Sequence, residues 1–225
     1  MDNVLSATTA NNLFWLGRYV ERGYLMLHLM RKAYDEVIDV PEGEAPYSDF
    51  LTKLNGYACS NFTTSYQMMQ QIYDANNATS LRAVIERMMD NAIVLRPYIY
   101  SESFSYVELC RNRISMEAEK GEMNITDLQP ITDWLLAFWG SVGERLHGRV
   151  HDLLAIGRLI ERLDICLRFD YKHYRIIETW SELMRQMDCC PDLYDAAQAG
   201  LIDEALQQQY DRNKVLQLLW GLIKV

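Results

Sequence analysis

The stretch Leu16-Gly-Arg-Tyr-Val-Glu-Arg22 decides the fold, because it returns as Ile156-Gly-Arg-Leu-Ile-Glu-Arg162 in the last third of the chain. Both copies read Gly-Arg-x-x-Glu-Arg and lie in runs of apolar residues at helical spacing, near 13–29 and 153–169. So long a separation indicates two related helical hairpins rather than a solenoid of short repeats. We therefore expect an all-α protein, a single-domain helical bundle over residues 1–225, with two long central helices that carry the motifs.

The flanking patterns extend this expectation to the rest of the chain. Helical periodicity predicts the two long helices over residues 8–38 and 150–177. The stretch Asn76-Asn-Ala-Thr-Ser80 supplies capping residues before a further periodic run that starts at Leu81, and Thr126 with Gln129 matches a capping box. No stretch alternates polar and apolar residues between hairpin turns, so little or no sheet is expected.

Composition narrows the class of function. The 225 residues are 49% hydrophobic, enough for a sizeable core, and carry a formal net charge of -9. The acidic residues are spread along the chain, which disfavours binding to nucleic acids or anionic membranes. The start lacks a basic segment and an unbroken apolar run, so we expect a cytoplasmic protein. The five cysteines show no Cys-x-x-Cys spacing, which favours reduced thiols without a structural zinc or other cofactor.

The charged residues of each motif lie at i, i+3 and i+4 and therefore share one helix face. Apolar residues bracket this face, and further apolar residues line the opposite side of each helix. A helix that is apolar on both sides is a central one, so its charges are partly buried and must be paired. The glycine before each arginine allows another backbone to approach closely. We expect the two motif helices to cross, with Glu21 and Glu161 each clamped by arginines, some of them from the other copy.

Each motif has two arginines for one glutamate, which leaves an excess of positive charge. Arginine binds carboxylates and phosphates through two parallel contacts, so a carboxylate or phosphate ligand is one candidate for the missing anion. Another acid of the chain, such as Glu102 or Asp164, is the alternative and would make the cluster a structural network. The candidate binding residues are Arg18, Glu21, Arg22, Arg158, Glu161 and Arg162.

Two further features of the sequence bear on function. Glu144, His147 and His151 have the spacing of one helix face, but no second Glu-x-x-His motif accompanies them and glycines flank them. We therefore expect solvated or capped histidines and no metal site, with a helical metalloenzyme that uses His147 and His151 as an alternative. The apolar segment 215–223 is predicted to pack into the core or to form a contact between copies in a homo-oligomer.

Several segments in order along the chain carry a resemblance to a known family. They are Asn11-Asn-Leu-Phe-Trp-Leu-Gly-Arg-Tyr-Val-Glu-Arg22, Ile156-Gly-Arg-Leu-Ile-Glu-Arg-Leu-Asp164, Asn76-Asn-Ala-Thr-Ser-Leu81, Asp90-Asn-Ala-Ile-Val-Leu-Arg96 and Ser101-Glu-Ser-Phe104. Together they resemble the bacterial alpha-E family of helical domains, which is named for a Glu-Arg signature.

Members of that family are typically encoded beside ATP-grasp ligases and transglutaminase-like proteins. The resemblance therefore implies an accessory or substrate-binding component of a system that forms amide bonds, with an ATP-grasp ligase or a transglutaminase-like protein as partner. A scaffold that contacts the ligase and binds nothing small is the alternative. No local motif assigns a reaction to the chain itself.

Overall fold

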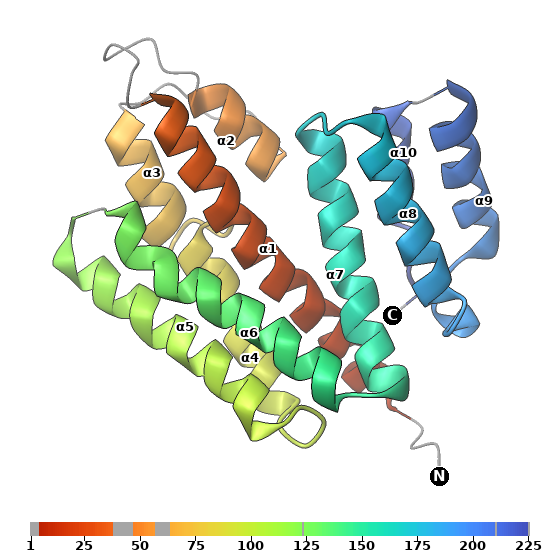
Figure 1. The fold of residues 1–225 in the computed structure, drawn as a ribbon, viewed down its shortest axis with the longest axis horizontal. Helices are drawn as coiled ribbons and strands as arrows, with labels where there is room; N and C mark the ends of the chain where they lie inside the picture. The colour runs from red at the N-terminus through yellow and green to blue at the C-terminus, as the bar shows by residue number, and fades with distance from the viewer. Residues whose placement is uncertain (1–4, 38–46, 57–63, 123, 210, 225) are drawn as a thin grey trace. The chain divides into compact units, whose positions relative to one another are not determined.

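The computed structural model describes residues 5–37, 47–56, 64–122, 124–209 and 211–224. Helices make up nearly all of the described chain, and its β-structure is an isolated antiparallel bridge between Tyr194 and Ile223 (Figure 1). The prediction of an all-α protein is confirmed. In chain order the α-helices are α1 (Ala7–Val37), α2 (Tyr47–Asn55), α3 (Thr64–Tyr73), α4 (Leu81–Val94), α5 (Ser101–Lys120), α6 (Gln129–Arg145), α7 (Gly148–Arg168), α8 (His173–Met187), α9 (Ala196–Glu204) and α10 (Arg212–Leu219).

The chain divides into two compact units. Unit 1 consists of Met1–Arg18 together with His147–Val225, and unit 2 consists of Tyr19–Leu146. Helix α1 belongs to both, since its first part, up to Arg18, lies in unit 1 and the rest in unit 2. The single domain that the sequence analysis expects over residues 1–225 stays a prediction.

Unit 2 is built mainly from α4, α5 and α6, with α5 packed against both of the others. Helix α4 begins where the sequence predicts, because the Ser80 side chain accepts a hydrogen bond from the backbone N–H of Ala83. Helix α5 meets α6 through a buried hydrogen bond of 2.9 Å between the hydroxyls of Ser103 and Ser141. The predicted capping box is wrong: Asn124 caps a short 3₁₀ turn at residues 125–128, and α6 starts after that turn.

Unit 1 is built around α7, which packs against α8 and α10. Helix α7 is buried on nearly all sides, as expected for a central helix. The chain end is held to the segment before α9 by backbone hydrogen bonds, from Asp195 N to Leu222 O (2.8 Å) and from Lys224 N to Leu193 O (2.7 Å). The apolar last segment therefore packs within unit 1, with Val215 and Leu222 fully buried.

The long helix predicted over residues 150–177 is interrupted, which corrects the sequence analysis. Helix α7 ends at Arg168, and Asp170 adopts a left-handed conformation with φ of 55°. The N–H of Tyr171 then bonds to the carbonyl of Cys166 at 3.0 Å, which satisfies a helix-end carbonyl and turns the chain. Glycine usually occupies this position, so an aspartate there gave no warning of the break.

Candidate functional site: the Arg18 pocket

The two motif glycines lie where the first part of α1 crosses α7 in unit 1. A Cβ atom added to Gly17 would lie 2.2 Å from the carbonyl oxygen of Leu154, and one added to Gly157 would lie 2.1 Å from the carbonyl oxygen of Phe14. Any side chain at either position would overlap backbone atoms of the other helix. The expected crossing of the two motif helices is confirmed, and each copy supplies one of the glycines that permit it.

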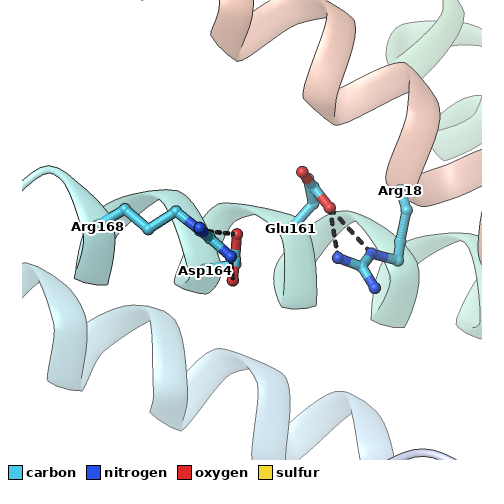
Figure 2. A network of polar contacts seen from close by, with 4 residues as sticks. All are labelled: Arg18, Glu161, Asp164 and Arg168. Carbon is cyan, nitrogen blue, oxygen red and sulfur yellow. Dashed lines mark hydrogen bonds and ion pairs between the residues drawn. The ribbon is translucent and has the colours of Figure 1, made fainter. Parts of the chain in front are cut away.

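The close crossing brings an arginine of one motif against the glutamate of the other. Arg18 donates to the same oxygen, Oε2 of Glu161, through Nε at 2.9 Å and Nη2 at 2.7 Å (Figure 2). Arg18 is 9% exposed and Glu161 is 1% exposed. Glu161 is thus clamped by an arginine from the other copy, as the sequence analysis predicts, and the two buried charges neutralise each other.

Aromatic rings surround the same guanidinium group. Its central carbon lies 4.9 Å from the centre of the Trp15 ring, 5.8 Å from Trp220 and 5.9 Å from Phe14. Cations are attracted to the faces of such rings at these distances. The third nitrogen of the guanidinium, Nη1, takes no part in the bonds to Glu161, and Figure 2 shows it pointing away from that carboxylate.

A second ion pair lies one turn further along α7. Arg168 donates to Asp164 through Nε at 2.7 Å and Nη2 at 3.2 Å, and the carboxylate is only 6% exposed (Figure 2). This paired geometry fixes the plane of the carboxylate. Asp164 was considered above as a partner for the motif arginines, but here it binds an arginine outside the motif. The other acid considered, Glu102, pairs with Arg145 at 2.6 Å in unit 2.

A cavity of about 160 Å³ lies beside Arg18 and Asp164. It is small beside the sites of drug-sized ligands, which measure roughly 300–1,000 Å³. Its wall joins the two charged side chains to aromatic and aliphatic groups from α1, α7 and the end of the chain. The lining residues are Phe14, Trp15, Arg18, Ile160, Asp164, Leu219, Trp220 and Ile223. We call this cavity the Arg18 pocket.

The other candidate residues do not line this pocket. Glu21 is fully buried and belongs to unit 2 together with Arg22, whereas Arg158 and Arg162 are half-buried on α7 in unit 1. Each of these four side chains is engaged by neighbouring groups. Their part in binding a ligand stays a prediction.

The predicted shared helix face of Glu144, His147 and His151 is wrong. Glu144 lies in the last turn of α6, whereas His147 precedes α7 as its N-cap and His151 lies in the first turn of α7. Leu146 and His147 separate the two helices, and the left-handed Gly148, with φ of 62°, begins α7. Across the described residues, no three His, Cys, Asp or Glu side chains are placed to share a metal ion.

Sequence reasoning missed the aromatic half of the site. Trp15 stands inside the quoted motif segment, but a tryptophan in an amphipathic helix is usually a core residue. Trp220 lies far along the chain in an apolar segment, and nothing in the local pattern connects it with Arg18. The signal that could have found Trp220 is its residue type, because tryptophan is the preferred aromatic partner of an arginine cation.

No helix among the described residues is long and apolar enough to cross a bilayer. Neither a curated protein nor a solved structure matches the chain. Residues 5–212, nearly the whole chain, do match a family described as a predicted alpha-helical domain with a conserved ER motif. The chain therefore belongs to the Alpha-E family.

Proposed function

We propose that this chain is a substrate-binding component of an amide-bond-forming system, and that the Arg18 pocket holds a carboxylate group of the substrate. The observation that carries the proposal is a guanidinium held in one orientation at the wall of a cavity. Glu161 binds Arg18 at one edge, and the ring centres of Trp15 and Trp220 lie 4.9 Å and 5.8 Å from the guanidinium carbon. A donor that is already oriented loses little entropy when it binds.

Charge favours a carboxylate over a phosphate in this pocket. Arg18 is paired with Glu161 and Asp164 with Arg168, so the two charged side chains of the wall are opposite in sign and each has a partner. A phosphate dianion would bring two negative charges towards Asp164, whereas a carboxylate brings one. A monoanion that accepts bonds from Nη1 fits the same surroundings, because the N–H groups of Nη1 remain outside the pair with Glu161.

The partner in this proposal is an ATP-grasp ligase or a transglutaminase-like protein. The chain matches the Alpha-E family over residues 5–212, and the expected association of that family with such enzymes supplies this setting. The chain would present a carboxylate-bearing substrate, and the partner would carry out the chemistry.

A helical scaffold is the second candidate, and one observation favours it. Both charged residues of the pocket are already paired within the chain, Arg18 with Glu161 and Asp164 with Arg168. Such pairs also occur where their only role is to specify one packing arrangement. In this case the chain would contact the ligase without binding a small molecule.

Two measurements separate these candidates. The first is co-purification with the neighbouring ligase, followed by an ATP-dependent ligation assay with and without this chain. The second is calorimetric titration of the chain with leucine and with leucinamide, which lacks the carboxylate. Substrate binding predicts that leucine binds more tightly than leucinamide, and that Trp220→Ala, at a 68% exposed position, weakens leucine binding and ligation. If the two compounds bind equally and ligation is unchanged in Trp220→Ala, the substrate-binding proposal is wrong and the helical scaffold is the supported function.

A further inference from the structure

Two opposite charges line the Arg18 pocket, and together they define a narrower ligand class. We infer that the pocket binds a free α-amino acid with an apolar side chain, whose ammonium group binds Asp164 while its carboxylate binds Arg18. The inference rests on the proposed function for the carboxylate and adds the recognition of the amino group and of the side chain.

Each charged wall residue is oriented by a partner that does not itself line the cavity. Glu161 holds Arg18, and Arg168 holds Asp164 through both carboxylate oxygens. A carboxylate has about four lone-pair sites, so two remain on Asp164 when Arg168 uses two. The ammonium group of an amino acid supplies three donors for such sites.

Both charged residues line one small cavity, which a single small molecule can occupy. Asp164 follows Glu161, the partner of Arg18, by three residues on α7, a rise of about 4.5 Å along the helix axis. In an α-amino acid both charged groups are attached to one carbon atom. A ligand with well-separated charges would extend beyond a cavity of about 160 Å³.

Ligands with a single charge are disfavoured by the same wall. A simple carboxylate gains from Arg18 but is repelled by Asp164, and a simple amine meets the reverse arrangement. A zwitterion places each of its charges opposite the complementary one. Specificity of this kind arises because a ligand with one charge meets a like charge on the wall without a contact that offsets it.

The remaining wall suits an apolar side chain. Leu219, Ile160 and Ile223 supply aliphatic groups, and the ring of Trp220 supplies a broad apolar face. Burial contributes about 0.8 kcal/mol per CH₂ group. Leucine should therefore bind at least about tenfold more tightly than glycine, which carries the same two charges.

The test is calorimetric titration of the full chain with leucine, glycine, leucinamide and N-acetylleucine, which lacks the ammonium group. We expect N-acetylleucine to bind about tenfold to a hundredfold more weakly than leucine, because it loses one charged hydrogen bond to the pocket. In Asp164→Asn the preference for leucine over N-acetylleucine should disappear. Glu86→Gln is the matched control, because it removes a carboxylate charge from an exposed ion pair with Arg111 in unit 2.

Asp164→Asn leaves Arg168 without its partner, so the double variant Asp164→Asn with Arg168→Gln is measured beside it, with circular dichroism to verify folding. Equal affinity of wild-type chain for leucine and N-acetylleucine overturns this inference but not the carboxylate site. A loss of the preference for leucine over leucinamide overturns the proposed site itself. Absence of leucine binding at millimolar concentration also overturns the inference, and the ligation assay then decides the proposed function separately.

Discussion

At the residue scale, the stability of unit 1 depends on charges that solvent barely reaches. Arg18 and Glu161 bond at 2.7 Å and are almost completely buried. The desolvation of both ions offsets much of their attraction, so the pair as a whole adds little stability relative to well-packed apolar residues. Removing one member is different, because the other charge then stays buried without this ion pair.

We predict that Glu161→Ala lowers the free energy of unfolding by about 3–5 kcal/mol. The double variant Arg18→Met with Glu161→Leu should recover most of that loss, since neither charge of this pair remains. Urea denaturation of the wild type, the single variants Arg18→Met and Glu161→Leu, and the double variant measures the coupling. Glu86→Ala, in an exposed ion pair, serves as control and should cost no more than about 1 kcal/mol. A single variant as mild as this control would mean that the pair is not structurally important.

The buried phenol of Tyr73, in unit 2, should make the stability of the chain depend on pH. Burial, with added repulsion from Glu117 and Asp127, raises the pKa of Tyr73 to about 12 from its ordinary value of 10.0. Above pH 10 the unfolded chain ionises this group while the folded chain keeps it neutral. Its contribution to stability is therefore present below pH 10 and is lost as the pH rises towards 12.

Tyr73→Phe should remove this part of the alkaline destabilisation. Among the described residues the Tyr73 hydroxyl has no hydrogen-bond partner, so at pH 7 the variant should be neutral or more stable by up to about 1 kcal/mol. Denaturation curves between pH 7 and 11.5 give the free energy of unfolding of the wild type and of the variant at each pH. Parallel pH profiles would contradict the assignment of the raised pKa to Tyr73.

Half of the candidate site could be predicted at this scale. The pairing of Arg18 with Glu161 follows from motif spacing, because charges on a helix that is apolar on both sides need partners. The pairing of Asp164 with Arg168 also has a local signal, since the two are four residues apart. Trp220 could not be predicted, because its place beside Arg18 depends on how the end of the chain folds back.

At the element scale, two glycines set the distance between α1 and α7. Their hydrogen atoms face backbone carbonyls of the opposite helix, so no rotamer change can make room for a larger residue. The same feature explains why the motif begins with glycine in both copies. Helix propensity alone would favour alanine at these positions.

We predict that Gly17→Ala and Gly157→Ala each destabilise the chain by about 1–3 kcal/mol, because the helices must separate or shift. Gly200→Ala in α9 is the matched control: the added Cβ meets nothing within 4 Å. That variant should be more stable by about 0.4–1 kcal/mol. Thermal denaturation compares the three, and stabilisation by all of them would contradict the close crossing.

Helix starts and helix ends differed in how well the sequence predicted them. The first long helix was predicted over residues 8–38 and is observed over Ala7–Val37. The start of α4 could be predicted because a capping residue, Ser80, directly precedes an apolar run and its side chain can accept a hydrogen bond from the first turn. The end of α7 was not predicted, because Asp170 adopts the left-handed backbone conformation that glycine usually occupies.

At the scale of the whole molecule, unit 1 is assembled from both ends of the chain and unit 2 from the middle. Helix α1 is continuous from Ala7 to Val37 and so contributes turns to both units. Unfolding of either unit removes tertiary support from part of this helix. A helix without tertiary packing is only marginally stable in water.

We therefore predict that the full chain unfolds in a single calorimetric transition. Gly17→Ala should shift the entire transition by roughly 2–4 °C for each kcal/mol of destabilisation, since domains of this size respond in that range. Two resolved transitions, only one of them shifted, would show that the units melt independently. That result would also contradict the single domain expected from the sequence.

The placement of Trp220 has a practical consequence. Its indole is 68% exposed, lies 5.8 Å from a guanidinium cation and forms part of the pocket wall. Its fluorescence should therefore respond when a ligand replaces water against the ring or alters the field of Arg18. With Trp220→Phe as the reference for emission from the other tryptophans, occupancy of the pocket can be followed without any attached dye.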